Sequence, residues 1–369
     1  MTVDPIGGVW TYALDLARAL EPHGIKIALA SMGGHLTREQ HEDVLARKNV
    51  QLFESAYRLE WMDEPWHDVD RAGDWLLEIA ERVRPDLIHL NGYSHAVLSW
   101  HAPVVVVAHS CVLSWWRAVK NEEAPARYDR YRARIAAGLA AADCVIAPSV
   151  AMRNAVAVHY GAHINCVVIR NGRDPRSFFS TDKERLVFSC GRIWDEAKNL
   201  RLLDQITPRV QWPITVAGNP HHPGGSSVTL SNVHCAGKLP PTELAQQLSR
   251  AAIFVLAARY EPFGLSALEA GLSGYSLVLS DIPSLRESWN GAAIFVAPDD
   301  ASGFANALNG LIENGRRRDH FGQRARARAL EFSPHRMANE YLRAYRTCLR
   351  RECDAAARKP QCVFEEVAA

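Results

Sequence analysis

The sequence predicts an α/β protein made of two doubly wound domains. Short β-branched runs bounded by turn residues recur along all 369 residues, and stretches with apolar residues at helical spacing lie between most of them. The run Val104-Val105-Val106-Val107-Ala108 is apolar on both faces, as a parallel strand covered by helices on each side must be. A chain of this length exceeds what one hydrophobic core usually supports, which favours two domains.

Twelve strands are expected, six in each half of the chain. In the first half they span residues 25–31, 50–54, 86–91, 104–109, 144–148 and 166–170, and in the second half residues 186–190, 214–217, 233–236, 253–257, 277–280 and 293–297. Helical spacing is clearest over residues 10–20 and 75–83, and again from Leu265 onward. The basic stretch 316–351 predicts two helices separated at Ser333-Pro334.

The domain boundary is expected after Asn171-Gly172, in the polar stretch 173–183. Residues 1–175 and 176–333 would then form the two domains, and residues 334–369 a final helix and tail. A doubly wound sheet normally begins with a central strand, yet Gly7-Gly8 follows Met1 after only a few residues. We therefore expect a truncated first strand. Either the true coding sequence starts further upstream, which we favour, or the domain tolerates a stub.

The composition is that of a soluble globular protein, with 48% hydrophobic and 22% charged residues. A net charge of +1 argues against a nucleic-acid partner. The eight cysteines include no Cys-x-x-Cys pair, which indicates reduced thiols in a cytoplasmic protein. No stretch is long and apolar enough to span a bilayer, and no leader segment is evident, so a soluble or peripheral protein is expected.

The segment after the strand at 253–257 carries the strongest chemical signal. Gly264 allows a close backbone approach, and a helix that begins at Leu265 would point its first amides at an anion. Glu261 lies in the loop ahead of this helix, and Glu269 lies one turn inside it. The default alternative is a capping-turn role for Glu261 and a solvated position for Glu269.

The two carboxylates resemble the Glu-x7-Glu signature of retaining glycosyltransferases of the GT-B fold, in particular family 4 (group 1). This resemblance implies two Rossmann-like domains that face each other across a cleft, the first on the acceptor side and the second binding a nucleotide sugar, with a C-terminal helix that crosses back to the first domain. It extends to the segment 191–199, where Arg192 and Lys198 would grip the donor diphosphate and neutralise its growing charge. Asn199 stands where the family often has Gly. The alternative, surface cations at a helix start, is disfavoured by the helix dipole.

Further segments acquire roles through the same resemblance. Gly7-Gly8 is similar to the family's N-terminal glycine loop, so the Gly8 amide would approach the donor phosphate. His109 would contact the transferred sugar or assist the acceptor, although many strand-end histidines are simply hydrogen-bonded into the structure. The loop of Asn91, Tyr93 and His95 is a candidate acceptor contact. The donor base and sugar would be selected around Lys238 and Leu239.

The resemblance therefore implies a retaining, metal-independent hexosyltransferase that moves sugar from a nucleoside diphosphate sugar to a glycan or a lipid-linked acceptor. The expected catalytic residues are Glu261, His109, Lys198 and Arg192. The expected donor-binding residues also include Gly8, Lys238, Leu239, Phe263, Gly264, Leu265, Ser266 and Glu269. Two rival functions stay open, a GT-B-fold sugar-nucleotide epimerase and a non-catalytic nucleotide-sugar binder. A nicotinamide dehydrogenase is disfavoured because neither half begins with Gly-x-Gly-x-x-Gly.

Two charged segments each allow a structural and a functional interpretation. Asp68-Val69-Asp70 has the spacing of a metal-binding pair, but its position before the helical pattern at 75–83 predicts an N-terminal cap and no metal. The stretch 316–351 contains 11 arginines and three acidic residues. A solvated basic face is the ordinary explanation. The sharper one is peripheral contact with anionic lipid at the inner face of the membrane.

Overall fold

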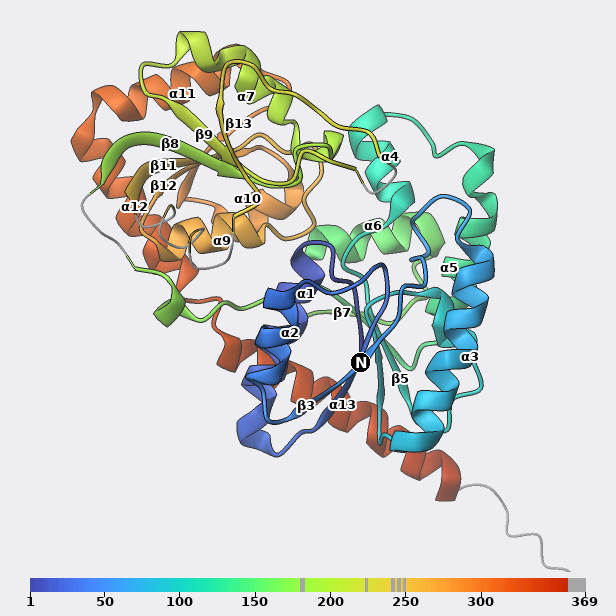
Figure 1. The fold of residues 1–369 in the computed structure, drawn as a ribbon. Helices are drawn as coiled ribbons and strands as arrows, with labels where there is room; N and C mark the ends of the chain where they lie inside the picture. Colours follow the sequence, from blue (N-terminus) through green and yellow to red (C-terminus); the bar gives the residue numbers. More distant parts are fainter. Residues whose placement is uncertain (180–182, 223–224, 240–242, 244–246, 248–249, 358–369) are drawn as a thin grey trace, which may run out of the picture.

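The computed structural model describes the chain except for residues 180–182, 223–224, 240–242, 244–246, 248–249 and 358–369. Two α/β bodies lie side by side, and each is built around parallel strands (Figure 1). Helices connect the parallel strands and cover both faces of each body's strands, which is why these strands are apolar on both faces.

The strands of the N-terminal body form two adjacent parallel groups. One has the order β1-β2-β3 and the other β4-β5-β6-β7. The groups meet where the Asn91 amide, just after β4, donates to Thr2 Oγ1 of β1 at 2.8 Å. The strand bounds are β1 (Thr2–Val3), β2 (Ile27–Ser31), β3 (Val50–Glu54), β4 (Ile88–Leu90), β5 (Val104–Val107), β6 (Cys144–Ala147) and β7 (Cys166–Val168).

Helices cover both faces of this body. One face packs against α1 (Gly8–Leu20) and α2 (Arg38–Leu45), and the other against the four helices that follow. Helix α1 buries Trp10, Ala13, Ala17 and Leu20, which recur at helical spacing. The four helices of the other face are α3 (Trp66–Val83), α4 (Val112–Lys120), α5 (Asp129–Ala141) and α6 (Val150–Tyr160).

The C-terminal body contains one six-stranded parallel sheet with the order β10-β9-β8-β11-β12-β13. The order reverses between β8 and β11, and ligands of such sheets bind at this switch point, beyond the carboxyl ends of the strands. The strand bounds are β8 (Glu184–Cys190), β9 (Ile214–Ala217), β10 (His234–Gly237), β11 (Ala251–Leu256), β12 (Ser276–Ser280) and β13 (Ala293–Val296).

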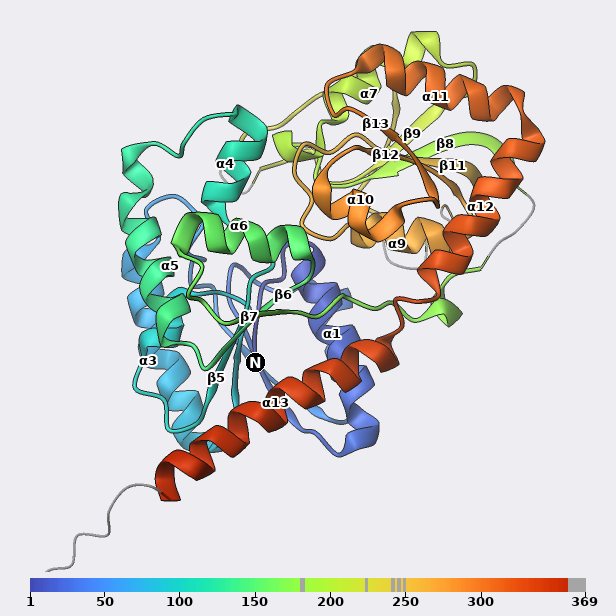
Figure 2. The same cartoon turned by 180° about the vertical axis from the view of Figure 1, so that it is seen from behind.

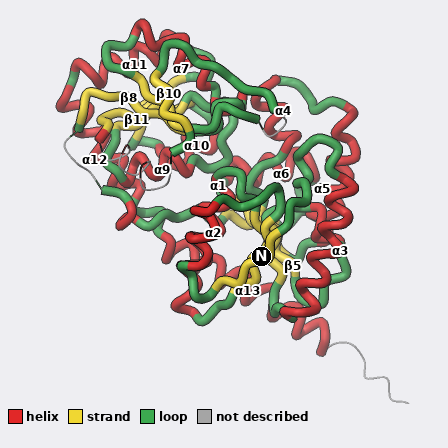
Figure 3. Tube along the Cα trace, viewed as in Figure 1, coloured by secondary structure: helices red, strands yellow, loops and turns green. Residues whose placement is uncertain are grey.

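Two helical layers cover this second sheet. One layer contains α7 (Leu200–Ile206) and α11 (Ala301–Glu313). The other contains α9 (Leu265–Leu272), α10 (Pro283–Trp289) and α12 (Gly315–Ala329). The tube view shows the two strand cores enclosed by helices (Figure 3).

The last helix, α13 (Pro334–Ala357), crosses back from the C-terminal body and packs along the N-terminal body (Figure 2). The chain passes between the bodies twice, in the linker after β7 and just before α13, and these two segments touch each other. A Cβ on Gly172 of the linker would clash with the Ser333 carbonyl oxygen. Only glycine fits such a close backbone approach. The Arg173 amide also donates to the Phe332 carbonyl at 3.1 Å.

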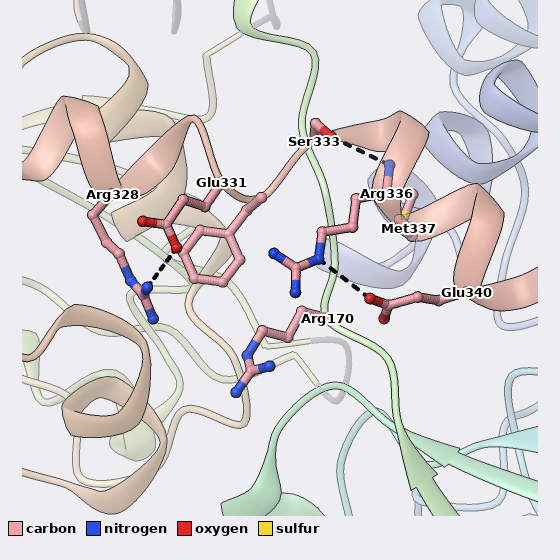
Figure 4. Close-up of a pocket in the computed structure, with 8 residues that line it drawn as sticks. Arg170, Arg328, Glu331, Ser333, Arg336, Met337 and Glu340 are labelled. Carbon is pink, nitrogen blue, oxygen red and sulfur yellow. Dashed lines mark hydrogen bonds and ion pairs between the residues drawn. The ribbon is translucent and has the colours of Figure 1, made fainter.

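A small pocket lies beside this crossing, between the start of α13 and the linker that follows β7 (Figure 4). Ion pairs line it, Arg328 with Glu331 at 2.6 Å and Arg336 with Glu340 at 3.3 Å, and Arg170 closes its floor. None of the residues predicted to bind the donor lines this pocket. It is therefore separate from the candidate active site.

All twelve predicted strands are present, each with ends within two residues of the prediction. The stub strand β1 pairs in parallel with β2, and the Met1 amino group donates to the Ala28 carbonyl at 2.7 Å. An upstream start of the coding sequence stays a prediction. The helix predicted at 75–83 begins at Trp66, so Asp68 and Asp70 lie inside the helix and the N-cap prediction is wrong. Among the described helices, none is long and apolar enough to cross a bilayer.

Candidate active site

The N-terminal glycine loop meets the C-terminal body at the switch point of its sheet. A Cβ on Gly7 would stand 3.2 Å from Nη1 of Arg192, and one on Gly8 would stand 3.1 Å from Cδ1 of Leu265. Gly7 has φ 98°, a left-handed conformation that favours glycine. The sequence therefore brings the loop, one predicted cation and the start of α9 into one place.

Lys198 and Glu261 form an ion pair in this place. Nζ of Lys198 lies 2.5 Å from Oε2 of Glu261, and the two side chains are only 16% and 12% exposed. The other oxygen of Glu261 accepts a hydrogen bond from the Gly264 amide at 3.1 Å. Lys198 ends the 3-10 turn Glu196–Lys198, and the Ala197 carbonyl of that turn accepts the Arg259 amide at 2.8 Å. The two predicted residues are thus held together by backbone as well as by charge.

Arg192 is paired with Asp195, a residue that the sequence analysis missed. Nη2 of Arg192 lies 2.6 Å from Oδ2 of Asp195, whose side chain is 4% exposed. Burial opposes ionisation of Asp195, but the nearby Arg192 and Lys198 guanidinium and ammonium groups lower its pKa overall. In the sequence Asp195 lies three residues from each of the two predicted cations, and this spacing is the signal that could have identified it. Asp195 is therefore paired with Arg192 and lies close enough to Lys198 to be affected by its charge.

Glu269 is buried, 8% exposed, and is not a solvated helix position. Its Oε1 lies 3.0 Å from Nη2 of Arg173 in the linker, and Arg173 also pairs with Asp15 of α1. Burial raises the pKa of Glu269, and Arg173 partly offsets this effect. The triad Asp15–Arg173–Glu269 thus joins both bodies through the linker. Sequence reasoning missed Arg173 and Asp15, because they lie 158 positions apart.

The acidic residues and Lys198 gather around one buried thiol. Burial raises the pKa of Cys190, at the end of β8, and the charges of Glu269, Lys198 and Glu261 all act on it. Two predicted carboxylates and one predicted cation therefore border the same end of β8. Arg192, which follows this strand by two residues, adjoins them through Asp195.

The start of α9 has the predicted form, with one exception. Gly264 has φ 90° and caps the helix, whose first residues are Leu265 and Ser266. Phe263, predicted to bind the donor, is 5% exposed and packs against Phe332 with ring centroids 5.8 Å apart. Its side chain belongs to the hydrophobic core, so only its backbone is left to face a donor.

His109 and Asn91 meet at the carboxyl ends of β5 and β4. Nε2 of His109 lies 2.9 Å from Oδ1 of Asn91, and the imidazole packs edge-on against Tyr12 with centroids 4.5 Å apart. Burial lowers the pKa of His109 to about 3, so the ring is neutral near pH 7. A neutral imidazole has one donor nitrogen and one acceptor nitrogen.

The other two predicted acceptor contacts are engaged inside the N-terminal body. The Tyr93 hydroxyl donates to the Ser110 carbonyl at 2.6 Å, and His95 Nε2 lies 2.9 Å from the Val69 carbonyl. Both residues are 9% exposed or less. Both side chains thus hold hydrogen bonds to backbone carbonyls, while His95 also lines a small pocket together with Asn91, so their acceptor contact stays a prediction. Of the three, only Asn91 lies beside His109.

The remaining predicted residues lie at the edge of the site. Lys238 is exposed and Leu239 packs against the C-terminal core, directly after β10 at the sheet edge. The residues that follow, 240–242, lie outside the described part of the chain.

The Asp-x-Asp pair is occupied by structural contacts. Asp68 accepts the Arg58 amide at 3.1 Å, and Asp70 pairs with Arg134 at 2.6 Å. Across the described residues, no group of three His, Cys, Asp or Glu side chains could hold a metal ion.

Comparison with known proteins places this geometry in a family. Residues 6–177 match the family model "Glycosyltransferase Family 4", and residues 184–314 match "Glycosyl transferases group 1". The chain is similar to an alpha-maltose-1-phosphate synthase of Mycobacterium tuberculosis, with 27% identity over 70% of this chain and 76% of the relative. It is 44% identical to a glycogen synthase of the same organism over 80 residues, which span 21% of this chain and only 19% of that protein.

Two solved structures share the fold. Sucrose-phosphate synthase from Thermosynechococcus elongatus gives a TM-score of 0.77 at 18% identity, covering 96% of this chain and 99% of the other. Anabaena HepE in complex with UDP-glucose gives 0.73 at 16% identity, covering 94% and 100%. The family matches take in both bodies of the molecule. The chain therefore belongs to the group 1, family 4 glycosyltransferases, which have the GT-B fold.

Proposed function

We propose that this glycosyltransferase transfers a hexose from a nucleoside diphosphate sugar to the hydroxyl of a glycan or a lipid-linked acceptor, with retention of anomeric configuration. The observation that supports this most is the Lys198–Glu261 pair, bordered by Arg192 and the Gly7-Gly8 loop at the switch point of the second sheet. Cations at this edge suit a diphosphate, and a nearby carboxylate suits sugar hydroxyls.

The donor would exchange partners with the residues of the site. The diphosphate would take Arg192 from Asp195 and Lys198 from Glu261, and the Gly8, Leu265 and Ser266 amides would add backbone donors. Glu261 would then accept hydrogen bonds from the sugar, and Glu269 from the ribose. Because two cations supply the neutralising charge, we propose a metal-independent reaction.

Retention follows from a front-face route, as the family resemblance implies. The acceptor oxygen bonds to the anomeric carbon while the bond from that carbon to the phosphate oxygen breaks. The acceptor proton passes to the leaving phosphate. Arg192 and Lys198 stabilise the charge that grows on this leaving group, so their main effect falls on the transition state.

A thermal-shift panel tests the donor. Sucrose and maltose, which give two of the similar proteins their names, both contain glucosyl units, and HepE was solved with UDP-glucose. Glucose donors are therefore the first to be tested. The panel contains uridine, guanosine and adenosine diphosphate glucose, and the bound donor should raise the unfolding midpoint. Slow release of free nucleoside diphosphate would then indicate a transferase. A binder would give the shift alone, and an epimerase would interconvert the sugar without phosphate release.

We further propose a cytoplasmic protein that contacts the membrane peripherally. Exposed arginines on α13, at positions 336, 343, 346 and 350, fall on one side of the helix. Such a basic stripe attracts anionic lipid headgroups. Sedimentation with anionic vesicles at low salt tests this contact, and its absence with vesicles of neutral lipid is the control. Protein that stays in the supernatant in both cases would contradict the proposal.

A further inference from the structure

The crossing helix α13 reaches the candidate active site through a buried chain of hydrogen bonds. The Tyr345 hydroxyl lies 2.7 Å from Nδ1 of His89 on β4. Nε2 of His89 lies 3.2 Å from Oδ1 of Asn91, and this oxygen also contacts Nε2 of His109 at 2.9 Å. Tyr345 and His89 are 8% and 3% exposed, so water does not compete for these bonds.

The direction of each bond follows from one fixed amide. Asn91 Nδ2 lies 2.7 Å from the Thr2 carbonyl, which can only accept, so Oδ1 of Asn91 must be the acceptor at the other end. Both histidines therefore donate to Oδ1 from Nε2. A neutral His89 then has its lone pair on Nδ1, and the Tyr345 hydroxyl must donate to it.

The same logic fixes the tautomer of His109. Its Nε2 carries the proton, so Nδ1 carries the lone pair, and within the described residues Nδ1 has no hydrogen-bond partner. The ring is partly exposed, and Tyr12 packs against it and limits its rotation. The chain thus leaves one acceptor nitrogen of His109 for a substrate hydroxyl.

We propose that Tyr345 and His89 are positioning residues that support the Asn91 amide fixed by Thr2, and so keep the proton of His109 on Nε2, so that Nδ1 of His109 accepts a hydrogen bond from a hydroxyl of the bound sugar or acceptor. The proposal rests on the proposed transferase function for the role of His109, but the tautomer itself does not. Helix α13 thereby acts on a group at the carboxyl end of β5.

Tyr341 provides a matched control on the same helix. It is fully buried, one turn before Tyr345, and its hydroxyl accepts a hydrogen bond from Tyr12 at 2.6 Å. Its ring stacks on His89 with centroids 5.7 Å apart, a contact that Tyr341→Phe keeps. Tyr345→Phe and Tyr341→Phe each remove one buried hydroxyl and keep the ring. A merely structural effect should therefore be similar in the two variants.

The first experiment needs no activity. Long-range ¹H–¹⁵N spectra of histidine-labelled protein distinguish the two neutral tautomers, and His89→Gln and His109→Gln assign the signals. We expect Nε2–H at both rings in the wild type and in Tyr341→Phe, and a shift toward Nδ1–H in Tyr345→Phe. An Nδ1–H signal for His109 in the wild type, or unchanged tautomers in Tyr345→Phe, would overturn the proposal even if no donor is found.

The second experiment uses the transferase assay. Tyr345→Phe should lower kcat by roughly tenfold or more with little change in the donor KM, and Tyr341→Phe should leave kcat unchanged. In the His109→Ala background, Tyr345→Phe should cause no further loss, because both substitutions act through one group. Equal losses in both backgrounds would show that Tyr345 does not act through His109. A wild type without transfer would refute the proposed function and leave the spectra as the test of the tautomer.

Discussion

At the scale of single residues, the candidate site pairs each predicted catalytic cation with a carboxylate, Arg192 with Asp195 and Lys198 with Glu261. Lys198 is the clearest case, since its ammonium group is largely buried against Glu261. We expect Lys198→Ala to lower kcat by roughly 100-fold, because the charge it stabilises grows mainly in the transition state. Steady-state kinetics with the donor found in the panel measures this. Exposed Lys26→Ala is the control, and wild-type turnover in Lys198→Ala would remove Lys198 from the site.

Asp4 lies beside the glycine loop and gives a prediction on pH. Burial raises the pKa of Asp4 to about 7 from an ordinary value of 3.8, although the Ile6 amide, Arg192 and Trp61 act in the opposite direction. The folded state therefore holds this proton more tightly than the unfolded chain, so Asp4 contributes stability at low pH that is lost as the pH rises through 7. Asp4→Asn stays neutral and should unfold at a midpoint roughly 2 °C above the wild type at pH 8.

The same comparison at lower pH supplies the internal control. The gap should shrink as the pH falls from 7 toward 3.8, because the wild-type carboxyl is then protonated in the unfolded chain as well as in the folded protein. Asp86 is exposed, so Asp86→Asn should have the same unfolding midpoint as the wild type both at pH 8 and at lower pH. A gap between Asp4→Asn and the wild type that is independent of pH would mean that Asp4 does not titrate near neutrality.

At the scale of elements, the sequence predicts the strands well and the helix starts less well. A strand such as β5 is apolar on both faces, so composition alone marks it. Helix α3 begins nine residues earlier than predicted. Its apolar positions Trp66, Val69 and Ala72 are interleaved with charged residues on the outer face, which obscured the pattern.

The candidate site also has a part that the sequence predicts and a part that it does not. Glu261, Gly264 and Glu269 lie within one short segment, and local chain geometry suffices to predict their neighbourhood. Contacts between distant segments had no local signal. Asp15 with Arg173, and His89 with Tyr345, which are 256 positions apart, meet only because α13 and the linker cross between the bodies.

Arg173 joins the linker to α1 and α9, which leads to a prediction on stability. Arg173→Leu would leave Glu269 buried without its cation, a change that typically costs about 3–5 kcal/mol. Asp15 would keep its pair with Arg18. Denaturant unfolding should show a lower midpoint with little change in slope. Arg176→Ala is the control, since Arg176 is itself exposed and its partner Asp174 keeps a second cation, Arg18. Equal midpoints for Arg173→Leu and the wild type would mean that the triad adds no stability.

At the scale of the whole molecule, side chains of one body complete elements of the other. Glu287 of α10 accepts the Val150 and Ala151 amides of α6 at 2.9 and 3.0 Å, and so caps a helix across the interface. Lys120 of α4 pairs with Glu196 at 2.6 Å, and Ser149 donates to the Pro262 carbonyl at 2.6 Å. Polar contacts thus hold the two bodies against each other.

Removing the Glu287 carboxylate, which caps α6 from the other body, should loosen the contact between the two bodies. We expect Glu287→Ala to increase the radius of gyration of the donor-free protein in small-angle scattering, because two helical amides lose their acceptor. A saturating donor should restore the compact value. Asp281→Ala removes an exposed carboxylate that pairs only with neighbouring Arg286, and should leave the scattering unchanged. Identical curves for the two variants would mean that Glu287 does not hold the bodies together.

The return of α13 also affects how the protein is made. Met337, Tyr341, Leu342 and Tyr345 belong to the core of the first body, although the ribosome adds them near the end of synthesis. Early domains ordinarily fold as they emerge. Here part of one apolar face, the part that α13 covers, stays open to water until almost the entire polypeptide has left the tunnel. Nascent chains halted just short of residue 334 should therefore depend on chaperones.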